Sequence, residues 1–251
     1  MITIKNNNLS AEIRNPGEDL EQLGTRYCHG GYIWQIYDRE GRPLMSGPHY
    51  PDPCPIPFDG QGMPEAFKSP ELVQPCHWDI DKGDDYAAMS TQQQSIKLRR
   101  EVRIAGNRIE SATSVENISG DDVPILWFSH PFFPLNPNLT CGKISPPVIN
   151  LPQNAGYDID DSGMIRMKPE YPWPKGLFQL IGVCEDKLTF EIPHPTAGQL
   201  ILATDYPVAK CPVWANKNTF SFEPFIERTL HPSQKTAWTI TLTAGNNRIA
   251  R

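Results

Sequence analysis

The chain has 251 residues, of which 39% are hydrophobic and 10% aromatic, enough for one large hydrophobic core. Its formal net charge is -6, and it contains no long block of Lys and Arg, so we expect no nucleic-acid partner. The first residues lack the apolar segment of a signal peptide, and no run of about 18 apolar residues could span a membrane. We therefore expect one domain, residues 1–251, in a soluble cytoplasmic protein.

The cysteines are spread along the chain and form no C-x-x-C pair. This spacing argues against a zinc site of the usual kind and favours reduced thiols over disulfides. Neither a metal nor an organic cofactor is predicted. The six cysteines are Cys28, Cys54, Cys76, Cys141, Cys184 and Cys211.

The regular elements predicted along the chain are strands. The 26 prolines and 18 glycines interrupt most windows long enough for a helix, so helices should be few and short. Apolar residues instead alternate with polar ones, or form short runs between turn signals, as in half-buried strands. The predicted strands lie in residues 1–6, 30–38, 95–104, 107–117, 124–130, 186–192, 198–205, 218–225 and 236–245. Together they predict a large antiparallel β-protein.

Two long segments, residues 46–75 and 136–177, break this rhythm because they are rich in proline and poor in periodicity. Long loops in compact domains are usually functional or disordered. The aromatic and apolar content of both segments is too high for disorder. We therefore predict two ordered loops that cover the same open face of a sandwich.

An ionisable side chain, His130, interrupts the apolar stretch PILWFSHPFFPLNPN at residues 124–138. One interpretation is a core or strand-end histidine held by a backbone carbonyl. The other is a functional histidine at the floor of a cleft. Phe132 and Phe133 would then wall this cleft, and Pro131 and Pro134 would stop the strand.

Three segments in order support the second interpretation. They are GGYIWQIYDREGRPLM (30–45), SVENISGDDVPILWFSHPFFPL (114–135) and FSFEPFIERTLHPSQKTAWTITLTAG (220–245). Their order and turn patterns resemble the galactose mutarotase-like superfamily of aldose 1-epimerases and hexose-phosphate mutarotases. The resemblance implies a large twisted antiparallel β-sandwich, all-β, of the supersandwich type. It implies a carbohydrate partner, an aldose or aldose phosphate, bound by a monomer or homodimer.

By this resemblance His130 is the general acid and Glu223 the general base of anomer interconversion. The reaction removes the proton of the anomeric hydroxyl and protonates the ring oxygen, so an imidazolium and a carboxylate suffice without a cofactor. Burial would lower the pKa of such a histidine, and a carboxylate within about 4 to 6 Å would raise it. The alternative for Glu223 is an edge-strand carboxylate before a proline.

The chain departs from the family because it lacks the expected His-Gly element before the strand of His130. Gln61, Glu65 and His77 stand in that part of the chain and could bind sugar hydroxyls. His77 could equally be a strand-end residue packed beside Trp78. Trp173, held between prolines, could stack on a pyranose ring or simply cap the core.

Two functions are therefore open. The first is a mutarotase or epimerase, and the second is a non-catalytic carbohydrate-binding or regulatory protein on the same fold. The enzyme requires His130 and Glu223 to face one cleft across a sugar-sized gap. A side chain of either residue that pointed into the core would favour the binding protein.

Overall fold

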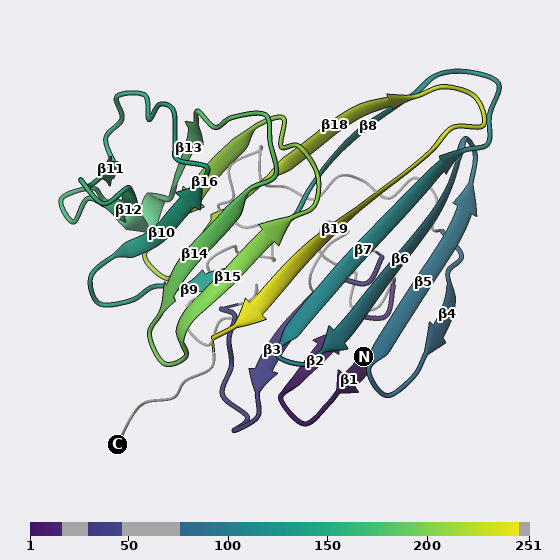
Figure 1. Cartoon of the computed structure of the whole chain (residues 1–251), viewed down its shortest axis with the longest axis horizontal. Coiled ribbons are helices and arrows are strands. Elements are labelled where there is room, and N and C mark those ends of the chain that lie inside the picture. The colour runs from purple at the N-terminus through teal and green to yellow at the C-terminus, as the bar shows by residue number, and fades with distance from the viewer. Residues whose placement is uncertain (17–29, 47–75, 246–251) are drawn as a thin grey trace.

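A computed structural model describes residues 1–16, 30–46 and 76–245, and the regular structure of these residues is almost all antiparallel strand (Figure 1). Their helical content is one 3-10 turn, η2 (Trp173–Lys175). None of the described helical structure is long and apolar enough to cross a membrane. The prediction of a β-protein with scarce helices is confirmed.

The largest element is a ten-stranded sheet with the strand order β11-β12-β10-β14-β15-β19-β7-β6-β5-β4, which runs across the whole width of Figure 1. Its members are β4 (Asp79–Lys82), β5 (Tyr86–Gln93), β6 (Ile96–Ala105), β7 (Arg108–Asn117), β10 (Thr140–Ser145), β11 (Tyr157–Ile159), β12 (Met164–Met167), β14 (Thr189–His194), β15 (Gly198–Thr204) and β19 (Lys235–Ala244).

Three smaller sheets accompany the large one. The first contains β1 (Ile2–Lys5), β2 (Leu9–Ile13) and β3 (Ile33–Asp38), in that order. The second has the order β13 (Leu177–Ile181), β16 (Cys211–Ala215), β17 (Thr219–Phe222) and β9 (Phe133–Pro134). The third pairs β8 (Val123–Phe128) with β18 (Phe225–Leu230).

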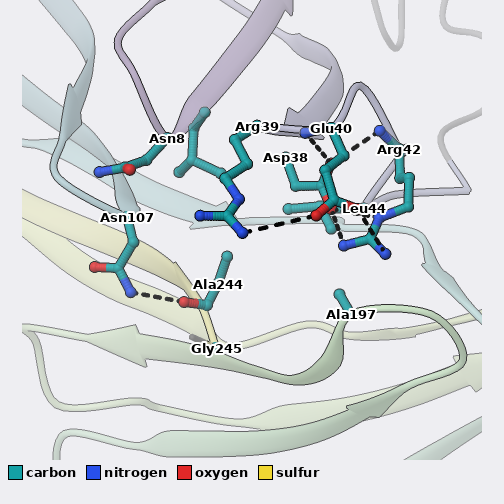
Figure 2. Close-up of a pocket in the computed structure, with 11 residues that line it drawn as sticks. Asn8, Asp38, Arg39, Glu40, Arg42, Leu44, Asn107, Ala197, Ala244 and Gly245 are labelled. Carbon is teal, nitrogen blue, oxygen red and sulfur yellow. Dashed lines mark hydrogen bonds and ion pairs between the residues drawn. The ribbon is translucent and has the colours of Figure 1, made fainter. Parts of the chain in front are cut away.

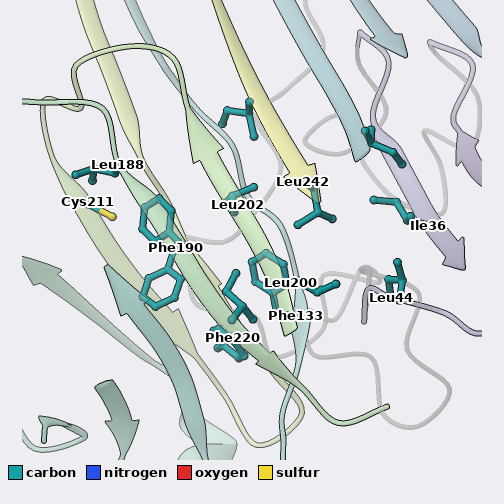
Figure 3. Packing of buried hydrophobic residues seen from close by; sticks show 14 of the residues in the cluster. Ile36, Leu44, Phe133, Leu188, Phe190, Leu200, Leu202, Cys211, Phe220 and Leu242 are labelled. Carbon is teal, nitrogen blue, oxygen red and sulfur yellow. The ribbon is translucent and has the colours of Figure 1, made fainter. Parts of the chain in front are cut away.

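The hydrophobic core lies on one face of the large sheet. Along β7 and β19, every second side chain is buried, as expected for strands with one face on the core. One cluster of buried residues joins this face to side chains of all three smaller sheets, including Ile36, Phe220 and Ile226. Figure 3 shows Phe133, Phe220 and Leu242 within this packing. The predicted twisted β-sandwich is confirmed.

Segment 136–177 differs from the predicted loop. It contains β10, β11, β12 and η2, and β10 pairs with β14, so the segment extends the edge of the large sheet. The strand β12 does alternate, with Ile165 and Met167 buried and Arg166 exposed, but it is too short to stand out between prolines and glycines. Of the other predicted loop, residues 47–75 lie outside the described residues.

A buried histidine closes the hairpin between β14 and β15. His194 is 6% exposed, and its Nδ1 accepts hydrogen bonds from the backbone N–H groups of Ala197 at 2.9 Å and Thr196 at 3.2 Å. Burial lowers the pKa of His194 from its ordinary 6.5 to about 4. The folded protein therefore holds a neutral imidazole at a pH where the unfolded chain binds a proton.

This histidine predicts a loss of stability in mild acid. Between pH 6.5 and pH 4 the unfolded chain gains a proton at His194 that the folded chain does not, so the free energy of unfolding should fall by roughly 2 to 3 kcal/mol. In His194→Asn, the amide oxygen can accept the same two backbone hydrogen bonds but does not titrate. Urea unfolding at several pH values should show a smaller loss in this variant.

The matched control is His231→Asn, because the side chain of His231 is 69% exposed. This control should lose as much stability in acid as the parent does. Equal losses in His194→Asn and the parent would contradict the assignment.

Candidate active site

The candidate site lies where two neighbouring strands pass together from one sheet to another. One connection leads from β8 to β9, and the other leads from β17 to β18. On one side of these connections β8 pairs with β18, and on the other side β9 pairs with β17. The register is the same on both sides of the gap, with Phe128 opposite Phe225 and Phe133 opposite Phe220. Continued through the gap, this register places His130 directly opposite Glu223.

Prolines explain why the ladder is interrupted. Pro131 and Pro224 lie on the two segments and have no backbone N–H to donate. Other segments satisfy the backbone groups beside the gap, since the N–H of Glu223 donates to the carbonyl of Pro212 at 3.0 Å. The phenol of Tyr206 donates to the carbonyl of Pro224 at 2.9 Å, and burial raises the pKa of Tyr206, so it stays a donor. The gap is thus a fixed part of the fold.

His130 and Glu223 are in direct contact. Nε2 of His130 lies 3.3 Å from Oε1 of Glu223, and the two side chains are 14% and 6% exposed. The contact is an ion pair when the imidazole is protonated. Cross-strand neighbours have closely spaced Cβ atoms, so the ladder register itself brings the two groups together.

Aromatic rings surround the histidine. The imidazole stacks on Phe132 with ring centroids 4.4 Å apart, and it lies 5.9 Å from Trp214 in an edge arrangement. Beyond it, Phe128 and Phe225 stack at 4.2 Å. Such low-polarity surroundings strengthen the interaction between an imidazolium and a carboxylate.

The predicted walls of the site are half right. Phe132 does lie against His130, but Phe133 is fully buried and packs on Phe220 at 5.5 Å between centroids, away from the imidazole. The strand β8 already ends at Phe128, before Pro131, and Pro134 is the last residue of a separate short strand, β9. The alternation of side chains along a strand places adjacent phenylalanines on opposite faces.

Of the remaining predicted residues, the structure describes His77 and Trp173. Gln61 and Glu65 lie outside the described residues. The side chain of His77 is 91% exposed, and its Nε2 lies 3.6 Å from Oδ1 of Asp79. His77 therefore sits on the surface just before β4.

Trp173 is 6% exposed and belongs to the core cluster. Its indole N–H donates to the carbonyl of Lys168 at 2.8 Å. Its ring contacts Tyr157 and Tyr171 edge-on, at 5.3 and 4.7 Å between centroids. The structure thus favours the second of the two interpretations of this residue, in which the tryptophan caps the core.

Sequence reasoning missed two residues near the pair. Trp214 contacts both His130 and Phe132, and Ser221 is its cross-strand partner. The hydroxyl of Ser221 is buried and makes no hydrogen bond within the described part of the chain. The signal for both was weak, because β16, which carries Trp214, and β17, which carries Ser221, are buried at every position and show no alternation.

A separate pocket of about 300 Å³ lies beside β3 and the end of β19 (Figure 2). Its charged groups already satisfy one another, since Arg42 contacts Asp38 at 2.7 Å and Glu40 at 3.1 Å. The pocket contains none of the predicted site residues. Elsewhere in residues 1–16, 30–46 and 76–245, no three His, Cys, Asp or Glu side chains gather as metal ligands would.

The sequence matches no family model and no curated protein. The fold does match solved structures. A galactose mutarotase related enzyme from Lactobacillus acidophilus superposes with a TM-score of 0.65 at 12% identity, over 98% of this chain and 97% of that one. A protein from Escherichia coli K12, provisionally described as an aldose 1-epimerase, gives 0.60 at 14% identity, over 97% and 98%.

A galactose mutarotase-like protein from Lactobacillus casei gives a TM-score of 0.55 at 12% identity, over 98% of this chain and 100% of that one. Each similarity covers nearly the whole of both chains. The identities are low, so these matches bear on the fold and leave the chemistry to the site residues. The chain therefore has the galactose mutarotase-like fold.

Proposed function

We propose that the protein interconverts the anomers of an aldose or aldose phosphate, with His130 as general acid and Glu223 as general base. The observation that carries the proposal is the 3.3 Å contact between these two groups at a gap in the β-ladder. The shared fold of mutarotase-like proteins supports the same reaction class. Cytoplasmic action without a cofactor, as expected from the sequence, is part of this proposal.

The reaction uses two oxygens bonded to the same carbon. Glu223 takes the proton of the anomeric hydroxyl while the His130 imidazolium protonates the ring oxygen, and the bond from C1 to that oxygen breaks. The aldehyde group rotates, and the hydroxyl formed from the ring oxygen attacks its other face. His130 then recovers its proton and Glu223 returns the other, so both groups end as they began.

The distance between the groups differs from the expected sugar-sized gap. At 3.3 Å the pair leaves no room for a ring between the two side chains. A sugar would instead present its C1 edge to both groups from one side, because the two reacting oxygens share a carbon. Proton donors and acceptors in ligand-free enzymes often realign when substrate binds.

The first test of the mechanism is to remove each proton-transfer group. Glu223→Gln and His130→Asn should each lower the rate of anomer interconversion by at least about 100-fold, because each keeps the approximate shape and loses the proton transfer. Exchange NMR on a panel of aldoses and aldose 6-phosphates measures the rate. Circular dichroism checks that each variant keeps its strands.

Matched controls come from exposed residues of the same types. Glu227→Gln on β18 and His231→Asn change groups on the surface and should keep the parental rate. If both site variants matched the parent on its best sugar, the pair would have no part in catalysis. A parent that binds sugar without interconverting its anomers would favour the non-catalytic protein.

A second test asks whether the contact persists in solution. The carboxylate of Glu223 stabilises the protonated form of an imidazole 3.3 Å away, so its removal should lower the pKa of His130. The NMR titration midpoint of His130 should fall by about one pH unit or more in Glu223→Gln. Glu227→Gln should leave it in place. An unchanged midpoint in Glu223→Gln would show that the two residues are not neighbours.

A further inference from the structure

A second polar cluster lies on the inner face of the large sheet. In β6, Arg100 shares a face with the buried residues Val102 and Ile104, whereas Arg99 and Arg103 point to the outer face. The register places Arg100 opposite Met89 of β5 and Thr113 of β7, which are 1% and 3% exposed. A guanidinium thus projects from the core face of the sheet.

Arg100 is not neutralised by a carboxylate. Its Nε donates a hydrogen bond to the hydroxyl of Ser111 at 3.1 Å, and Tyr32 lies close enough to interact with its charge. No ion pair with an Asp or Glu of the described residues accompanies these contacts. The outer-face arginines differ, since Arg99 and Arg103 both contact Glu101, at 3.1 and 3.0 Å. Burial lowers the pKa of Arg100 to about 10, so the group is still charged at neutral pH.

Unused donors lie on the strands next to this cation. The hydroxyls of Thr91 and Thr113 and the indole N–H of Trp238 are buried and make no hydrogen bond within the described ranges. Thr113 lies directly opposite both Arg100 and Trp238. Thr91 lies two residues after Met89 on β5, and therefore on the same face of the sheet. Neighbouring strands are about 4.8 Å apart, so the backbones of the four residues lie within a few strand spacings.

An uncompensated charge and several unmade hydrogen bonds on a core face are costly unless a ligand uses them. Guanidinium and indole N–H groups only donate, and hydroxyls can donate. This set of donors without a nearby carboxylate matches an oxyanion. Arg100 as a whole residue is only partly buried, unlike Val102 and Ile104 on the same strand face.

We propose that Arg100, Thr91, Thr113 and Trp238 form a binding site for an oxyanion, a carboxylate or a phosphate. The oxyanion is either free or carried by a sugar. Its binding is separate from the proton transfers at His130 and Glu223. In the sugar-borne case the inference rests on the proposed function and narrows its substrate to an acidic sugar.

Binding of four probes tests the site: inorganic phosphate, glucose 6-phosphate, glucuronate and glucose. At least one oxyanion probe should bind the parent and raise its melting temperature. Arg100→Met should bind that probe at least about tenfold more weakly by calorimetry, because it loses charge-assisted hydrogen bonds. The control Arg99→Met, one residue away on the outer face, should bind like the parent.

Two further variants test the site if Arg100→Met does not fold. Thr113→Val removes one hydroxyl at nearly constant shape and should weaken binding of the same probe by about three- to tenfold. Arg100→Lys keeps the charge but loses the planar fork, so its affinity should fall between those of the parent and Arg100→Met. If Arg100→Met binds the probe as tightly as the parent does, the proposal is overturned. If Arg100→Met does not fold, parental affinity in both Thr113→Val and Arg100→Lys overturns it. A parent that binds none of the three oxyanions also overturns it.

The probes also identify the source of the oxyanion. Tighter binding of glucose 6-phosphate or glucuronate than of both phosphate and glucose assigns it to a sugar. Equal binding of phosphate assigns it to a free ion. The same binding measured in Glu223→Gln should persist, because the oxyanion site does not include Glu223. If the parent showed Arg100-dependent binding but no anomer interconversion, the proposed function would be contradicted and the oxyanion site would still be supported.

Discussion

One cross-strand contact defines the candidate site, between His130 of the β8–β9 connection and Glu223 of the β17–β18 connection. Both groups stand in a gap where two paired strands change sheets, and the register continues across that gap. Prolines on each side prevent the ladder from closing. The result is an imidazole and a carboxylate held together by the fold, with the backbone of the Glu223 segment held by hydrogen bonds to Tyr206 and Pro212.

The large sheet supplies the rigid frame for this arrangement. In this sheet β7 and β19 bury every second side chain. In the four-stranded sheet, β16 and β17 are buried at every position, so the segments that carry the pair have little freedom to shift. The same alternation also identifies polar side chains on the inner face of the large sheet. Polar groups occupy inner-face positions of β5, β6 and β7 that the strand pattern reserves for apolar side chains.

Much of the fold followed from the sequence, because period-two alternation is strong in β6, β7, β14, β15 and β19. Short or fully buried strands such as β12 and β16 gave no such signal. The identity of the pair came from the resemblance of segments around His130 and Glu223. Their direct contact did not, because it depends on the register between strands about ninety residues apart, which local patterns do not encode.

Other site details were equally non-local. The packing of Trp173 against Tyr157 and Tyr171, and the edge of Trp214 on the imidazole, arise from pairings between distant segments. Arg99 and Arg100 are adjacent in the chain, yet the pleat sends one toward water and carboxylates and the other toward the core. Composition alone could not separate them.

The most direct test of the central claim is a crystal structure of Glu223→Gln with the preferred aldose bound. The account predicts the anomeric and ring oxygens of the sugar within hydrogen-bonding distance of the side chains at positions 223 and 130, on one side of the pair. A sugar bound with its C1 edge elsewhere, for example in the charged pocket beside β3, would contradict it.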